Sequence, residues 1–150
     1  TLLIQFGELY MKTRTLAIIK PDAVASGYTG KITDRITNEG FTILKSKEMK
    51  MSLVQAEGFY EIHRGKPFYG ELTHFMSSGS CVVLALEKDN AVNEWRRVIG
   101  ATNPEEAEEG TIRKLYAKNL GQNAVHGSDS DENGKIEVSY FFAECELIKN

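Results

Sequence analysis

The chain is poor in cysteine and proline, with two cysteines and three prolines among 150 residues. Two cysteines cannot build the disulfide framework of a small secreted domain, and both Cys81 and Cys145 lie in apolar, strand-like runs. We therefore expect two buried free thiols, although a single disulfide also fits the sequence. The chain has no N-glycosylation sequon and no apolar run near the roughly 18 residues of a membrane span. These absences predict a cytoplasmic protein that does not enter the membrane.

A surplus of basic side chains is also missing. Lys and Arg number 18 and Asp and Glu number 21, so the formal net charge at pH 7 is −3. Binding to nucleic acid or anionic membranes needs a basic surplus, so neither partner is expected. What is present is an ordinary globular composition, 41% hydrophobic and 26% charged. Residues 1–10 lack the features of a signal peptide, so we expect an upstream or expression-derived extension, followed by a single domain over residues 11–150.

Short apolar strands alternate with amphipathic helices along the domain. Strands are predicted at residues 15–20, 41–49, 80–86 and 138–143. Helices are predicted around Ile32 and Ile36, from Ser52 to about Ile62, from Pro67, and from Asp89 or Asn90 to Gly100. This order favours a small α+β or α/β sandwich in which helices cover one face of a short sheet. Residues 101–134 contain only a weak helical stretch, and a loop of that length in a compact domain is usually functional or disordered. We interpret it as a long active-site loop.

The three histidines differ in their surroundings. His63 and His74 lie in helical segments without the i, i+4 spacing of a zinc pair, so each is expected to be a surface or satisfied core residue. His126 lies in the segment NAVHGSD and is followed by a glycine, a hydroxyl and a carboxylate. Small and polar neighbours leave the imidazole accessible and can fix its tautomer. His126 is therefore the candidate nucleophile for attack on a phosphoryl group.

Phosphoryl transfer also needs cations and hydrogen-bond donors around the phosphates. Lys20 ends the first strand, Arg96 lies in the last turn of a helix, and Arg113 lies in the long loop. Thr102 and Asn123 are candidate neutral donors. A single lysine or arginine is usually a solvated surface charge, but Lys20 closes an apolar strand and is expected to be held in place.

Two other ligand motifs fit the sequence less well. The Walker A pattern fails around Gly30 and Lys31, because positions 25 and 32 hold alanine and isoleucine instead of glycine and serine or threonine. Residues 129–134 begin like an EF-hand loop, but Tyr140 stands where a bidentate glutamate is required. Residues 130–135 are better interpreted as a polar, solvated turn, with calcium binding as a minor alternative.

With these residues in place, the chain resembles the nucleoside diphosphate kinase family over residues 15–147. The most specific segment is NAVHGSD at 123–129, which resembles the active-site signature of that family. Five further segments match in order and spacing, namely IKPDA at 19–23, PFY at 67–69, MSSG at 76–79, GATNP at 100–104 and GTIR at 110–113. The resemblance implies a ferredoxin-like αβ sandwich with a four-stranded antiparallel sheet covered by helices.

The resemblance further implies an enzyme that moves the γ-phosphate of a nucleoside triphosphate, typically ATP, to a nucleoside diphosphate by a ping-pong mechanism. His126 matches the phosphorylated histidine, Ser128 and Glu137 match the pair that orients it, and Tyr60 matches a packing or proton-network partner. The implied nucleotide contacts are Lys20, Arg96, Thr102 and Arg113 for the phosphates, Asn123 for the ribose, and Phe68, Leu72 and Leu120 for the base.

Mg²⁺ is implied as a bridge between phosphate oxygens, with Asp129 at most a partner through water. The resemblance also implies a homo-oligomer built from dimers, and the short end of the chain after Leu147 resembles the bacterial forms that make tetramers rather than hexamers. Two alternatives remain at this point. One is a ferredoxin-like sensor of small molecules whose histidine is incidental, and the other is a calcium-binding module.

Overall fold

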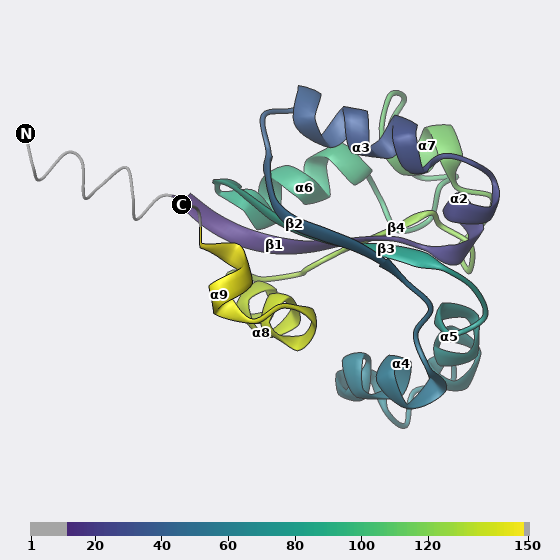
Figure 1. The fold of residues 1–150 in the computed structure, drawn as a ribbon. Coiled ribbons are helices and arrows are strands. Elements are labelled where there is room, and N and C mark those ends of the chain that lie inside the picture. Colours follow the sequence, from purple (N-terminus) through teal and green to yellow (C-terminus); the bar gives the residue numbers. More distant parts are fainter. Residues whose placement is uncertain (1–11, 149–150) are drawn as a thin grey trace, which may run out of the picture.

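The apolar runs of the sequence form a four-stranded antiparallel sheet in the computed structural model, which describes residues 12–148 (Figure 1). The strand order is β2-β3-β1-β4. The strands are β1 (Lys12–Ile19), β2 (Thr42–Met49), β3 (Cys81–Asp89) and β4 (Val125–Gly127). The expected α+β class, the antiparallel sheet and its ferredoxin-like order are confirmed. The expected extension at residues 1–10 lies outside the described residues.

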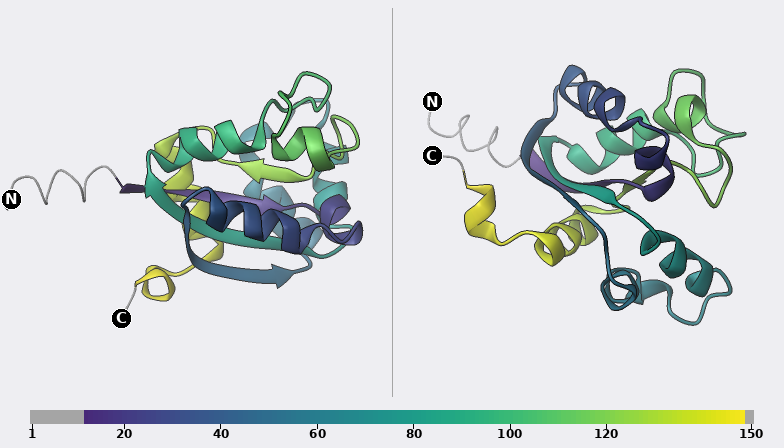
Figure 2. Two further views of the ribbon diagram at one scale, coloured as in Figure 1. Left: turned by 90° about the horizontal axis from the view of Figure 1, so that it is seen from above. Right: turned by 45° about the vertical axis from the view of Figure 1, so that its right-hand side comes forward.

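Helices cover both faces of the sheet (Figures 1 and 2). One face carries α2 (Pro21–Ala25), α3 (Thr29–Asn38), α6 (Ala91–Ile99) and α7 (Ile112–Tyr116). The other carries α4 (Leu53–Phe59), the 3₁₀ turn η1 (Glu61–His63), α5 (Tyr69–Met76), α8 (Asp131–Phe141) and α9 (Glu144–Leu147). The prediction that only one face is covered was wrong. Neighbouring residues of β1 such as Ile18 and Ile19 enter different cores, and an unbroken apolar strand is typical of a sheet buried on both sides.

The predicted strand at 138–143 is also wrong, because this segment belongs mostly to α8. Its run of β-branched and aromatic residues resembles a strand. However, Ser130 caps the helix by accepting a hydrogen bond from the backbone N–H of Asn133, and Val138 and Phe141 turn one helical face into the core. The fourth strand is instead β4, which is too short at three residues to show a periodic pattern. The long loop is therefore interrupted by α7 and β4.

The two cysteines have different environments. Cys81 is buried in β3, and burial raises the pKa of its thiol to about 11. Cys145 lies exposed on α9, so the expectation of two buried thiols is confirmed only for Cys81. Both cysteines are free. The error follows from the misassigned last strand, because the helical turn of α9 presents Cys145 to solvent.

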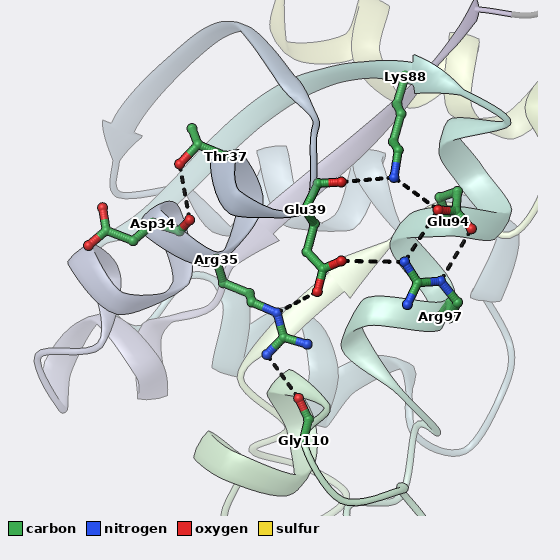
Figure 3. A network of polar contacts seen from close by, with 8 residues as sticks. All are labelled: Asp34, Arg35, Thr37, Glu39, Lys88, Glu94, Arg97 and Gly110. Atoms are coloured by element: carbon green, nitrogen blue, oxygen red, sulfur yellow. Dashed lines mark hydrogen bonds and ion pairs between the residues drawn. The ribbon is translucent and has the colours of Figure 1, made fainter.

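A polar network joins α3, β3 and α6 to the segment that precedes α7 (Figure 3). Arg35 binds Glu39 at 2.8 Å and donates to the carbonyl oxygen of Gly110 at 2.9 Å. Glu39 also pairs with Arg97 at 3.4 Å, and its carbonyl oxygen accepts from the Lys88 ammonium at 2.8 Å. Single surface ion pairs contribute little, but a connected set fixes geometry. The network holds the residues that lead into α7, which carries Arg113.

Candidate active site

His126 lies in the middle of β4 opposite Ile18 of β1, and its side chain is 15% exposed. Its Nε2 atom is 2.7 Å from Oε1 of Glu137 on α8. The same carboxylate oxygen accepts a hydrogen bond from Ser128 at 2.8 Å, and Ser128 accepts one from the backbone N–H of Leu16 at 3.2 Å. This network assigns the proton to Nε2 and leaves the lone pair of Nδ1 free for attack. Ser128 and Glu137 thus lie where an orienting pair has to lie.

Two aromatic rings stand beside the imidazole. The ring centroids of Phe59 and Tyr60 lie 5.2 Å and 6.2 Å from that of His126, both in edge-to-face geometry. The Tyr60 hydroxyl is buried and has no hydrogen-bond partner within residues 12–148. Burial raises the pKa of this phenol, and the charge of Glu137 adds to the effect, so Tyr60 remains a neutral donor. A buried hydroxyl of this kind can donate to a group bound at the histidine.

Lys20 directly follows β1 and is only 7% exposed. Its ammonium donates to Oδ1 of Asn123 at 2.9 Å. Burial and, to a smaller extent, the charge of Arg113 lower the pKa of Lys20 to about 8, and the carboxylate of Asp22 opposes both effects. A lysine with so low a pKa beside another cation is unusual for a structural residue. A desolvated cation therefore contacts Asn123, three residues before the candidate nucleophile.

Arg113 is pinned by backbone carbonyl groups. Its two terminal nitrogens donate to Gly100 at 3.0 Å and to Val125 at 2.9 Å, while its buried Nε has no partner within the described part of the chain. Burial lowers its pKa to about 10, and the charge of Arg96 acts in the same direction, which leaves the guanidinium charged at neutral pH. The group is thus held rigidly between the end of α6 and β4.

A hollow of about 630 Å³ opens beside β4 and is bordered by Gly127, the residue after His126. Its polar lining includes Arg96, Arg97, Thr102, Glu106, Glu108 and Arg113. Three of the four side chains that were expected to hold phosphates, Arg96, Thr102 and Arg113, therefore line one space, whereas Lys20 and the ring of His126 do not line it. Three guanidinium groups around a hollow of this size suit a polyphosphate.

The expected base contacts come from two segments at the same end of the sheet (Figures 1 and 2). Phe68 precedes α5, is 42% exposed, and lies in edge-to-face contact with His63 at 5.3 Å. Leu72, one turn later, is half-buried against the core. Leu120 is 59% exposed and lies between α7 and β4. Asn123 uses both ends of its amide, because its Nδ2 also donates to the carbonyl oxygen of Thr102 at 3.2 Å.

Close packing fixes the strand and helix that hold His126 and Glu137. Trp95 of α6 donates from its indole nitrogen to the carbonyl oxygen of His126 at 3.0 Å, and a Cβ at Gly127 would come within 2.9 Å of the same indole. A Cβ at Gly134 of α8 would come within 2.8 Å of the carbonyl oxygen of Arg14 on β1. Both glycines therefore allow a close approach that a larger residue would prevent.

Several sequence interpretations change in this part of the molecule. Residues 130–135 are not a solvated turn, because they form the cap and first turn of α8. The carboxylate of Asp129 accepts from Asn133 at 2.6 Å, and residues 12–148 contain no group of three or more side chains able to hold a metal. His74 is exposed on α5 away from these contacts, whereas His63 stacks on Tyr60 at 6.3 Å. The contact between His63 and Tyr60 could not be predicted from the sequence, in which the only indication is that the two residues are three positions apart.

The comparisons with known proteins agree with each other. A family model described as nucleoside diphosphate kinase matches residues 13–147. The nucleoside diphosphate kinase of Syntrophotalea carbinolica is 54% identical over 135 residues, which cover 90% of this chain and 98% of the relative. That of Phenylobacterium zucineum is 53% identical over 138 residues, which cover 92% and 99%.

Solved structures give the same result. The Aquifex aeolicus nucleoside diphosphate kinase superimposes with a TM-score of 0.89 at 41% identity, covering 91% of this chain and 99% of that chain. The halophilic nucleoside diphosphate kinase of Halobacterium salinarum, solved in complex with CDP, superimposes with a TM-score of 0.88 at 33% identity, covering 93% of each chain. Among residues 12–148, no helix is long and apolar enough to cross a membrane.

Proposed function

Since the chain belongs to the nucleoside diphosphate kinase family and transfers phosphate from nucleoside triphosphates to nucleoside diphosphates, we propose that His126 is the group that carries the phosphate between them. The support is the hydrogen bond between Nε2 and Glu137 at 2.7 Å, which directs the lone pair of Nδ1 away from the carboxylate. This contact is the observation that supports His126 as the nucleophile.

In the first half of the reaction, Nδ1 of His126 attacks the γ-phosphorus of the donor. A P–N bond forms as the bond between that phosphorus and the bridging oxygen breaks, and the nucleoside diphosphate leaves. The positive charge that develops on the imidazole is stabilised by Glu137, which Ser128 holds in place at 2.8 Å. In the second half, a terminal oxygen of an acceptor diphosphate attacks the same phosphorus and the P–N bond breaks. Tyr60 is proposed to donate its free hydroxyl to the phosphate while it is on the histidine.

Lys20, Arg96, Thr102 and Arg113 are proposed to hold the phosphates. Phosphoryl transfer depends mostly on positioning and charge neutralisation, and both Lys20 and Arg113 are already held by other groups of the chain. A cation that is fixed before the substrate arrives loses little conformational entropy on binding. The pinned guanidinium of Arg113 therefore suits a transition state better than a mobile surface arginine would.

The remaining contacts are proposed for the nucleoside. Phe68 offers an exposed ring for stacking, Leu72 and Leu120 offer apolar contacts, and Asn123 offers an amide to the ribose. Stacking uses the π-face that every base has, so it discriminates weakly between bases. Broad acceptance of nucleotides follows from this arrangement.

Mg²⁺ fits the site as part of the nucleotide substrate. The described residues contain no cluster of carboxylates, histidines and cysteines that could hold the ion, and Asp129 is engaged with Asn133. Bound with the nucleotide, the ion would supply further neutralisation of the charge on the phosphate oxygens. The protein's contribution is then to hold those oxygens through its own cations, with Asp129 as at most a partner through water.

We also propose a homo-oligomer assembled from dimers, a tetramer rather than a hexamer, that works in the cytoplasm as one domain over residues 11–150. β2 ends the described part of the sheet on one side, and a second copy could pair with that edge. Sedimentation velocity distinguishes the dimer, tetramer and hexamer directly.

The test of the proposed function is a pair of half-reactions. Brief mixing with γ-labelled ATP should label the protein with a phosphate that is labile to acid and stable to base. Adding an unlabelled nucleoside diphosphate should then move the label into a nucleoside triphosphate. A protein that takes up no label, or that retains it when the diphosphate is added, would exclude a phosphohistidine intermediate.

The pH dependence of the free enzyme should follow Lys20. Because burial lowers the pKa of Lys20 to about 8, the ammonium loses its proton as the pH rises through that value. The kcat/KM for the donor should therefore fall by about tenfold for each pH unit above it, while kcat changes less, because bound phosphates stabilise the ammonium. Steady-state kinetics from pH 7 upward measure both. A kcat/KM that stays constant to about pH 9.5 would contradict a requirement for this charge.

Replacing Gly134 with alanine should lower the free energy of unfolding and kcat together. The new Cβ would meet the Arg14 carbonyl oxygen at 2.8 Å. Overpacking of this kind costs about 1–3 kcal/mol. That exceeds the gain of roughly 1 kcal/mol that alanine has over glycine in a helix. Glu137 lies one turn further along α8, so a displaced helix also moves the partner of His126.

The matched control is Gly30→Ala in α3, where a Cβ would meet nothing within 4 Å. This variant should gain up to about 1 kcal/mol of unfolding free energy and keep its kcat. Urea unfolding and steady-state kinetics read the two quantities. If Gly134→Ala matched the control in both, close packing of α8 on β1 would not be what sets the distance between Glu137 and His126.

A further inference from the structure

Ala124 has a backbone conformation that alanine rarely adopts. Its φ is 71°, and within residues 12–148 only Asn90 among the other non-glycine residues also has a positive φ. The left-handed region is disfavoured for residues with a Cβ, and such outliers persist only where the surroundings impose them. Ala124 is completely buried and stands between Asn123 and the strand that holds His126. Part of the cause is local, because the N–H of Val125 donates to the carbonyl oxygen of Asn123 at 2.8 Å across Ala124.

Ala124 is held on both sides by the segment Lys20–Pro21–Asp22. Its N–H donates to Oδ2 of Asp22 at 3.1 Å, and its carbonyl oxygen accepts from the backbone N–H of Lys20 at 2.8 Å. Pro21 between them begins α2, and its ring fixes the local φ. The two contacts therefore come from a stiff segment. Of the two, only the contact with Asp22 depends on a side chain.

The left-handed turn at Ala124 determines where its neighbours point. Asn123 on one side places Oδ1 at 2.9 Å from the Lys20 ammonium. Val125 on the other side presents its carbonyl oxygen to Arg113 at 2.9 Å. If Ala124 relaxed to negative φ, the chain would change direction between these two contacts. The positions of both buried cations are thus linked to this one residue.

Asp22 also brings a negative charge to the same place. It is 7% exposed, and its second oxygen, Oδ1, is buried without a partner within the described residues. The charged groups that act on the Lys20 ammonium are Arg113 from α7, which lowers its pKa, and Asp22 from α2, which raises it. Asn123 adds a neutral acceptor. Asp22 is therefore the carboxylate whose charge opposes the loss of the Lys20 proton.

We propose that Asp22 is a positioning residue of the phosphate-transfer site, which fixes Ala124 in the left-handed conformation through Oδ2 and keeps Lys20 charged for the incoming phosphates. This role rests on the proposed function of Lys20 and His126. Asp22 acts only through these neighbours and touches no reacting atom. Its two tasks predict different effects for different substitutions, because an asparagine can accept the hydrogen bond of Ala124 but has no charge.

The experiment compares Asp22→Asn and Asp22→Ala with Asp34→Asn, in which an exposed carboxylate on α3 is neutralised. Asp34 enters the network of Figure 3 only through its carbonyl oxygen, so this control removes the same charge at a distance. The first readout is the pH dependence of acetylation of the Lys20 amine in nucleotide-free protein, followed by peptide mass spectrometry. The second is the pH profile of kcat and of kcat/KM. Circular dichroism verifies that each variant is folded.

Asp22→Asn should shift the titration of Lys20 to lower pH by about half a unit or more. It should also lower kcat/KM at pH 8 by about twofold or more and leave kcat nearly unchanged. Asp22→Ala should in addition lower kcat by about tenfold or more, because Ala124 loses its partner. Ala124→Gly in the Asp22→Ala background should recover part of kcat, because glycine adopts positive φ without strain. Asp34→Asn should behave as the wild type in both readouts.

An Asp22→Asn variant with the Lys20 titration and pH profile of the wild type would overturn the proposal, and so would Asp22→Ala with wild-type kcat. If Asp22→Ala does not fold, Asp22→Asn alone decides. If the wild-type protein takes up no phosphate on His126 while the Lys20 titration shifts as stated, the proposed function fails and the influence of Asp22 on Lys20 stands. The two failures are therefore distinguishable.

Discussion

Replacing His126 with alanine should abolish phosphate exchange between nucleotides, with a fall in kcat of at least about 10⁴-fold. The reason is that, among residues 12–148, His126 is the histidine whose Nε2 is held by a carboxylate, which leaves its Nδ1 as the proposed nucleophile. Without Nδ1 the protein can still bind nucleotides through its cations, so affinity should change far less than kcat. A coupled assay for triphosphate production measures the rate, and equilibrium dialysis measures the binding.

The matched control is His74→Ala, which removes an exposed imidazole on α5. This variant should keep the wild-type kcat within about twofold, because it contacts none of the groups around His126. A His126→Ala variant that retained a tenth of the wild-type kcat would mean that the phosphate passes directly between nucleotides or through another side chain.

The second large effect is expected at Lys20. Lys20→Gln should lower kcat/KM by about 10²- to 10³-fold, which is the typical effect of removing one fixed group that stabilises transition-state charge. A glutamine can still donate to Asn123, so the loss isolates the charge. Removing a buried charge that stands beside Arg113 should also leave the thermal stability unchanged or raise it. A fall in activity would then not be a consequence of unfolding.

Lys31→Gln on the exposed face of α3 is the control for the loss of one positive charge. Its kcat/KM should stay within about twofold of the wild type at physiological ionic strength, where distant surface charges are screened. If Lys20→Gln and Lys31→Gln had equal kinetics, the cation at the end of β1 would have no part in holding phosphate.

The strands that could be predicted from the sequence are those that can be recognised from the apolar pattern of their own residues. β1 and β3 contain unbroken apolar runs, and their alternate residues fill two cores. Short runs of this kind indicate strands rather than helices. The capping box at Ser52 and Gln55 likewise depends on residues three apart, and both of its hydrogen bonds are present. Elements that depend on residues close together in the chain could therefore be predicted from the sequence.

The errors concern segments whose structure is decided by distant residues. Val138 and Phe141 have strand propensity, but α8 packs along β1, where Gly134 meets the backbone of Arg14. Tertiary contacts of this kind override local preference. β4 is invisible to periodicity because it has three residues, and its pairing with β1 supplies the structure instead.

The candidate site divides in the same way. His126, Lys20 and Arg113 could be proposed as site residues from residue type and motif. What the sequence could not supply is the geometry that makes them useful: the 2.7 Å contact between Nε2 and Glu137, and the carbonyl groups that pin Arg113. Asp22 lay inside a recognised motif, yet the role proposed for it depends on the φ of a residue 102 positions away.

The location of the phosphate on the protein tests the central claim most directly. Protein labelled with ATP and kept at alkaline pH should give a single phosphorylated peptide by mass spectrometry, with the phosphate on His126. ³¹P NMR of the same sample should identify the Nδ1-phosphohistidine isomer, because Nε2 is engaged with Glu137. Phosphate on Nε2, on a serine, or on any other histidine would contradict the account.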